Sequence, residues 1–211
     1  MAAAITTLER VPDSVWPIIL HQRPGQNLAN REDFYEFCRD NEPWRIERGA
    51  NGALEVAMPA GWETGNRNQE LSGQLWLWAR QEGAGRAADS STGFELPGGA
   101  MRSPDASWVR KTRLESLTAT DRQRFLPLAP DFVAELRSES DRLAPLREKM
   151  QEYLDAGVSL ALLLDPTTRR VTVYRPNQEP IFLDNPTTVD CSPELPGFIL
   201  NVKAIFDAGE Q

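Results

Sequence analysis

The sequence predicts an α/β fold in which a mixed central sheet is flanked by helices and preceded by an N-terminal helix and hairpin. Two observations support this class. Segments with helical periodicity alternate with short strand-like runs bounded by Gly or Pro, and one run, at 159–164, is apolar on both faces. At 211 residues the chain has the size of one domain. We expect that domain at 31–206, after an irregular segment at 1–30 and before a tail at 207–211.

The elements before residue 66 are expected to be accessory to the core. In residues 31–40 an apolar helical face follows Asn30, a residue type that often caps helix N-termini. Two runs at 44–48 and 53–58 flank a turn rich in Gly and Asn, which is typical of a β-hairpin. The sequence therefore predicts an accessory helix followed by a pair of strands.

The core is predicted from the order of the elements after residue 66. Apolar side chains recur at helical spacing in 66–81, and Gly83 and Gly85 end that pattern. We count 86–90 and 93–96 as one interrupted strand. The order helix, three strands, helix, strand predicts two helices on opposite sides of the sheet. The remaining segments are strands at 105–110, 131–137 and 159–164, a helix at 146–154, a hairpin at 171–174 and 180–183, and a final strand and helical turn at 198–206.

Two acids are distinguished by their local sequence. Pro104 fixes the backbone just before Asp105 at the start of a strand. Glu135 lies between Ala134 and Leu136 in an apolar strand, where an unpaired charge is costly to bury. Carboxylates on adjacent strands supply the hard oxygen ligands that Mg²⁺ or Mn²⁺ prefers, and a metal-bound water can act as a nucleophile. This pair predicts metal-dependent hydrolysis.

Two cations could serve the same site. Arg137 lies two residues after Glu135, so strand alternation places it on the same face, where it could clamp a phosphate. Lys149 belongs to the following helix, and we favour it as the catalytic lysine. Tyr153, one turn later, shares the Lys149 face and could hold the lysine in position.

These motifs resemble a known family. SPD at 103–105, PDFVAELRS at 130–138, KMQEY at 149–153 and GVSLALLLDP at 157–166 resemble the Uma-type family of bacterial restriction endonucleases, within the PD-(D/E)XK (restriction-endonuclease-like) nuclease superfamily. The resemblance spans roughly residues 31–206. It implies an αβββαβ core, a divalent metal, and hydrolysis of DNA phosphodiester bonds by Asp105 and Glu135 with Lys149 serving the site.

The resemblance points to two further candidate site residues, and the sequence differs from the superfamily motif at one position. It implies that Glu70, on the first core helix, is an additional acidic metal ligand. We expect Ser138, in the AELRS motif, to be a supporting residue of the site. The sequence has E-L-R at 135–137 where the superfamily has E-x-K. That departure motivates an alternative function, a catalytically inactive interaction module of the same fold that binds nucleic acid or protein as a homodimer.

Simpler interpretations of the acids stay open. Asp105 could be a turn acid that caps a strand. Glu135 could face outward from a half-exposed sheet, or form a structural ion pair with Arg137 or Arg142. Glu70 could be a solvated helical carboxylate. The net charge of −8 also counts against a generic basic nucleic-acid binder, although Arg and Lys outnumber the acids in 101–126.

Composition bounds the location and partners. Two cysteines without CxxC spacing favour a reducing, cytoplasmic setting, and no apolar run is long enough to span a bilayer. We expect DNA as substrate, Mg²⁺ or Mn²⁺ as cofactor, a homodimer, and no membrane partner. A structural homodimer without enzymatic activity is a third hypothesis.

Overall fold

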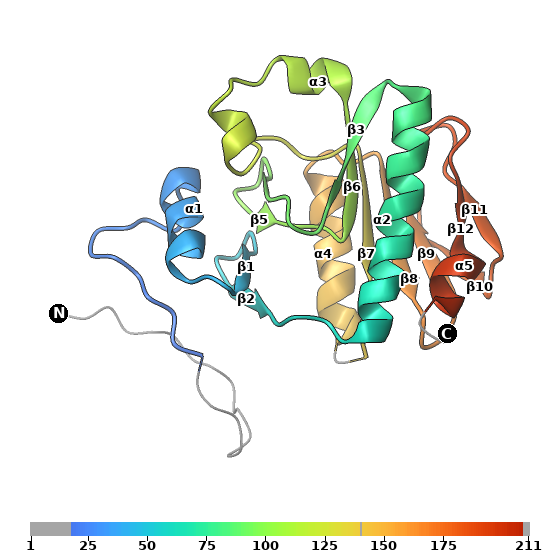
Figure 1. The fold of residues 1–211 in the computed structure, drawn as a ribbon, viewed down its shortest axis with the longest axis horizontal. Coiled ribbons are helices and arrows are strands. Elements are labelled where there is room, and N and C mark those ends of the chain that lie inside the picture. Colours follow the sequence, from blue (N-terminus) through green and yellow to red (C-terminus); the bar gives the residue numbers. More distant parts are fainter. Residues whose placement is uncertain (1–17, 140, 209–211) are drawn as a thin grey trace.

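The computed structural model describes residues 18–139 and 141–208 and confirms the predicted fold class (Figure 1). Its centre is a mixed six-stranded sheet in the order β10-β9-β8-β7-β6-β3, in which only β7 and β8 pair in parallel. The apolar run predicted at 159–164 forms β8, inside the sheet and buried along its whole length. The strands are β3 Gly85–Asp89, β6 Ala106–Arg110, β7 Phe132–Leu136, β8 Leu160–Asp165, β9 Arg170–Tyr174 and β10 Ile181–Asp184.

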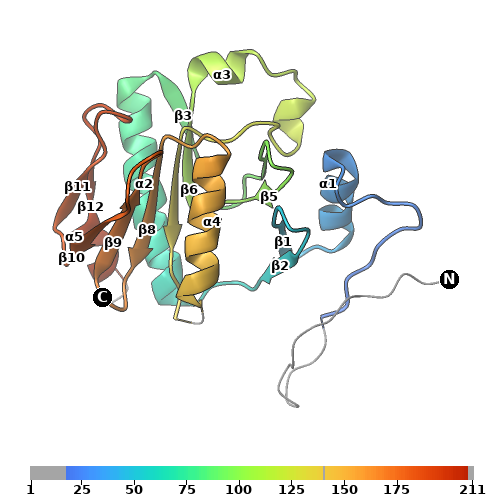
Figure 2. The same ribbon diagram turned by 180° about the vertical axis from the view of Figure 1, so that it is seen from behind.

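Two helices cover opposite faces of this sheet, as Figures 1 and 2 show from opposite sides. Helix α2 (Trp62–Glu82) buries Leu71 and Leu75 in one core, and α4 (Leu143–Asp155) buries Met150 and Tyr153 in another. The order α2, β3, β6, β7, α4, β8 confirms the predicted αβββαβ core. The short α5 (Val202–Asp207) packs on the same side as α2.

Alternation along β7 decides which side chains face α4. Phe132, Ala134 and Leu136 join the core beneath α2, whereas Val133 joins the core beneath α4. Because successive strand residues point to opposite faces, Glu135 lies on the α4 side with Val133. The strand therefore directs one buried carboxylate toward that helix.

A second, four-stranded sheet lies beside the core, in the order β2-β1-β5-β4. The predicted hairpin is confirmed as β1 (Arg45–Arg48) and β2 (Leu54–Ala57). The predicted N-terminal helix is α1 (Arg31–Asp40), and the Asn30 side chain accepts a hydrogen bond from the backbone N–H of Asp33. This accessory sheet carries side chains that reach the site described below.

The prediction of one interrupted strand at 86–90 and 93–96 is wrong. β3 belongs to the central sheet, whereas β4 (Phe94–Glu95) pairs with β5 (Met101–Arg102) in the accessory sheet. Gly93 marks the change, because a Cβ there would lie 2.2 Å from the ring of Phe125. The absence of a side chain at this position lets the chain pass close to that ring and enter the second sheet.

The rest of the described chain consists of short elements. Residues 18–30 contain turns only, and none of the described helices is long and apolar enough to cross a membrane. The expected closing elements are present as the β9–β10 hairpin and as β12 (Ile199–Asn201) followed by α5. β12 pairs with β11 (Thr188–Asp190), and the short α3 (Lys111–Glu115) and η1 (Asp121–Gln123) lie between β6 and β7.

Candidate active site

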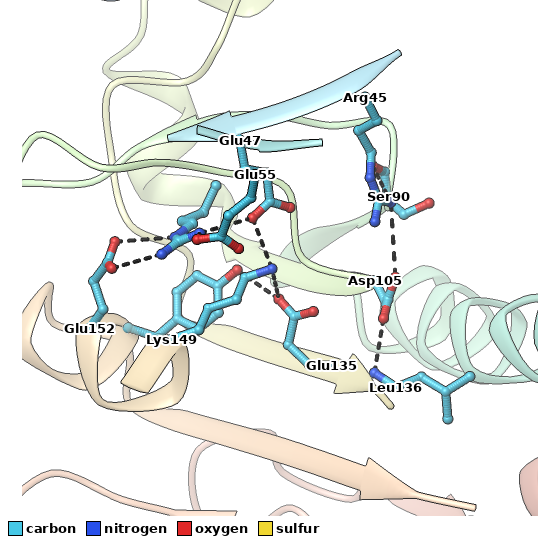
Figure 3. A network of polar contacts seen from close by, with 11 residues as sticks. Arg45, Glu47, Glu55, Ser90, Asp105, Glu135, Leu136, Lys149 and Glu152 are labelled. Carbon is cyan, nitrogen blue, oxygen red and sulfur yellow. Dashed lines mark hydrogen bonds and ion pairs between the residues drawn. The ribbon is translucent and has the colours of Figure 1, made fainter. Parts of the chain in front are cut away.

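A cleft of about 1060 Å³ opens between the accessory sheet, the start of α2, and the segment that joins β7 to α4. Its lining includes the two acids singled out in the sequence, and Figure 3 shows their surroundings. The accessory sheet supplies one wall. The cleft therefore depends on elements that the sequence predicted only as accessory to the core.

Asp105 and Glu135 are neighbours at the floor of this cleft. Asp105 immediately precedes β6, Glu135 lies on β7, and the antiparallel pairing of Ala106 with Ala134 brings the two acids together. The backbone N–H of Leu136 donates a hydrogen bond to Asp105 Oδ2 at 2.9 Å (Figure 3). Asp105 is 7% exposed and Glu135 5%, so both carboxylates are largely shielded from water.

Lys149 reaches the acids from α4. Its Nζ lies 2.8 Å from Glu135 Oε1 and 2.9 Å from Glu47 Oε2, so one ammonium bridges two carboxylates. The Tyr153 hydroxyl donates to the same Glu135 oxygen at 2.8 Å. The structure thus brings Asp105, Glu135, Lys149 and Tyr153 together, and it adds Glu47 of β1, which the sequence reasoning missed.

Arg102 holds Glu47 from the far side. This buried guanidinium on β5 bonds Glu47 at 3.3 Å, Glu55 at 2.6 Å and Glu152 of α4 at 2.9 Å. These contacts tie the accessory sheet to α4. The basic stretch at 101–126 therefore includes at least one arginine with a buried structural role. The open flank of the cleft carries Arg45, whose Nη1 lies 3.9 Å from Asp105 Oδ1.

The buried charges shift one another's proton affinity. Burial raises the pKa of Asp105, and burial raises the pKa of Glu135 to about 7, against the opposing attraction of Lys149. Burial also disfavours ionised Glu47, but Lys149 and Arg102 outweigh it and lower the Glu47 pKa. Burial similarly opposes the charge on Lys149, yet Glu135 and Glu47 raise its pKa overall. Lys149 therefore stays a cation and is not a proton acceptor.

The other residues singled out in the sequence lie farther from this centre. Arg137 lines the cleft, but its Nη1 bonds Asp165 at 2.9 Å. Ser138 also lines the cleft, and its backbone N–H donates to Asp141 at 2.8 Å. Glu70 is not brought to the site: it accepts a hydrogen bond from Gln74 at 3.0 Å and lines a second hollow beside α5, which shares only Trp62 with the cleft.

The donor set fits a small, hard divalent cation. Glu135 Oε1 pairs with the Lys149 ammonium and accepts a hydrogen bond from the Tyr153 hydroxyl, while Oε2 accepts no hydrogen bond from the described residues. Within those residues, no three carboxylate, thiol or imidazole groups converge to form a metal site by themselves. Mg²⁺ commonly uses one or two carboxylates and completes its shell with water and substrate phosphate. Asp105 and Glu135 can supply such a pair.

Comparisons with known proteins identify the fold and the family of the chain. The fold is restriction-endonuclease-like: a solved structure described as "a putative nuclease belonging to DUF820 from Anabaena variabilis ATCC 29413" matches with a TM-score of 0.67 at 20% identity, over 78% of this chain and 90% of that one. A family model described as "Uma2: Putative restriction endonuclease" matches residues 31–203. The chain belongs to this Uma2 family, which confirms the resemblance noted in the sequence.

Two further comparisons add nothing to this assignment. A chain of the "DrdV-DNA complex" matches with a TM-score of 0.34 at 17% identity, over 68% of this chain and 12% of that one. A search of curated proteins finds no significant match. The fold and family therefore rest on the Uma2 model and the Anabaena structure.

The raised Glu135 pKa predicts a pH-dependent stability in the absence of metal. Because the folded-state pKa is about 7 against an ordinary 4.5, the folded protein holds more protons between these values. The Glu135 contribution to the free energy of unfolding is therefore fully present below the lower value and lost as the pH rises through the upper one. Thermal melts of wild type and Glu135→Gln in chelator isolate this contribution, and the stability of the variant relative to wild type should increase with pH. A difference that is flat with pH would contradict the assignment.

Proposed function

We propose that the protein is a metal-dependent endonuclease that hydrolyses phosphodiester bonds of DNA. One observation carries the proposal: Asp105 and Glu135 lie side by side on adjacent strands at the floor of a cleft, with the Lys149 ammonium bonded to Glu135. Membership of a family described as restriction endonucleases supports the reaction class. DNA as substrate is part of the proposal.

Each side chain has a role set by its contacts. Asp105 and Glu135 would hold Mg²⁺ or Mn²⁺, which supplies a Lewis acid and a water of lowered pKa when bound. Lys149 contacts Glu135 Oε1 and would offer a permanent positive charge to a substrate phosphate held at the same acids. Tyr153 fixes the same oxygen, so Glu135 is oriented from two directions.

The E-L-R sequence is accommodated in this scheme. Arg137 occupies the position of the superfamily lysine but is engaged by Asp165, whereas Lys149 contacts Glu135 from α4. A lysine from the helix thus takes the place beside the strand acids. Arg137 lines the cleft and is proposed to support phosphate binding rather than proton transfer.

Cleavage of supercoiled plasmid tests the proposal, with Glu70→Gln as matched control. In Mg²⁺ or Mn²⁺, Glu135→Gln is expected to lose about 100-fold or more in rate, because it removes a metal ligand while preserving shape. Glu70→Gln makes the same chemical change in a different hollow and should cut like wild type. Equal cleavage by wild type and Glu135→Gln, or wild-type protein that cuts in neither metal, would overturn the proposal and favour the inactive interaction module.

A further inference from the structure

Trp62 stands at the rim of the cleft with most of its side chain in water. It is 76% exposed, at the first position of α2, and it lines the cleft together with Met58, which is 70% exposed. A large aromatic side chain gains nothing for folding from such a position, since its burial would be favourable. Both Figures 1 and 2 place the start of α2 and the start of α4 at the same end of the molecule.

Two arginines in the same cleft have capacity for an anion. Arg142 is exposed, lines the cleft, and has no carboxylate within ion-pair distance among residues 18–139 and 141–208. The Arg45 Nη1 donates to the Ser90 carbonyl at 3.3 Å and lies 3.9 Å from Asp105, but its Nε has no hydrogen-bond partner in that part of the chain. An aromatic side chain and two arginines therefore line the cleft that holds the acids.

The shape of the cleft favours a narrow ligand. Its volume of about 1060 Å³ is just above the ~300–1,000 Å³ that encloses a drug-sized molecule. A double helix presents its phosphates on a convex surface and has a major groove about 12 Å wide. The acids lie at the floor and are at most 7% exposed, so a flexible chain of nucleotides reaches them more easily than a rigid duplex.

We infer that the cleft binds a single DNA strand, with a base stacked on Trp62 and the adjacent phosphates held by Arg45 and Arg142. Aromatic side chains in a cationic groove are the usual means of holding single strands without sequence preference. This inference rests on the proposed nuclease function and narrows it to single-stranded or locally unpaired DNA.

Fluorescence anisotropy tests the inference with a labelled DNA strand and with the duplex made from it, both in Ca²⁺ and with strand integrity checked on a gel. Wild type should bind the single strand more tightly than the duplex. Trp62→Ala should weaken single-strand binding about 10-fold, because one base loses its stacking partner, while Trp62→Phe should retain most of the affinity.

Trp76→Ala is the matched control, because Trp76 lies on the same helix, is 51% exposed, and does not line the cleft. It should bind like wild type. Tighter binding of duplex, or equal losses in Trp62→Ala and Trp76→Ala, overturns the inference. Neither result touches the proposed function, which depends on Glu135 in the cleavage assay.

Discussion

Lys149→Met is expected to destabilise the protein by about 3–5 kcal/mol near pH 8, because it leaves two buried carboxylates without their shared cation. Lys149 Nζ lies within 2.9 Å of both Glu47 and Glu135, and all three residues are at most 8% exposed. Methionine keeps the length and apolar character of the stem, so the effect reports the lost charge. Chemical denaturation measures it.

The loss should shrink toward pH 5, where Glu135, whose pKa is already about 7, takes up a proton and no longer needs a counter-ion. Lys111→Met is the control, since that lysine pairs with Glu115 at 3.8 Å across an exposed surface. It should unfold at nearly the wild-type denaturant concentration. A Lys149→Met protein as stable as wild type near pH 8 would mean that the buried bridge does not form.

Asp105→Asn should stabilise the metal-free protein and remove its response to metal. Burial raises the Asp105 pKa, so ionised Asp105 weakens the fold, and it also repels Glu135. Asparagine can still accept the hydrogen bond from the Leu136 N–H, so the local structure is preserved. In chelator the melting temperature of Asp105→Asn should exceed that of wild type.

Addition of Mn²⁺ should reverse this order. Wild type gains stability from a ligand that binds only the folded state, about 2.7 kcal/mol at a metal concentration 100 times the Kd, whereas Asp105→Asn should gain little. Glu70→Gln should respond like wild type, since it lies in another hollow. A metal-free Asp105→Asn protein that melts below wild type would show that the ionised acid contributes to the fold.

The core of the fold could be predicted from local patterns. The apolar run of β8, the helical periodicity of α2 and α4, and the Asn30 cap each have a sequence signal that does not depend on distant residues. The separation of β3 from β4 has none, because it depends on the approach of Phe125 to Gly93, more than thirty residues apart in the chain.

The residues of the candidate site also differ in whether they have a local sequence signal. Asp105 follows a proline and Glu135 interrupts an apolar strand, so both are visible locally, and Lys149 and Tyr153 share a helix face. Glu47 lies in a four-residue strand with charged neighbours, and its importance comes from contacts with Lys149 at 2.9 Å and Arg102 at 3.3 Å, which are distant in the sequence. The place of Glu70 also depends on the tertiary structure: α2 covers the other face of the sheet, and Glu70 lies beside α5, away from Asp105 and Glu135.

A calorimetric titration of Mn²⁺ into wild type, Asp105→Asn and Glu135→Gln tests the central claim, that the two strand acids together hold one divalent ion. Wild type should bind with a stoichiometry near one, and each variant should lose most of the affinity because each removes one of the two protein ligands. Mn²⁺ binding of equal affinity in wild type and both variants would place the metal elsewhere and contradict the account.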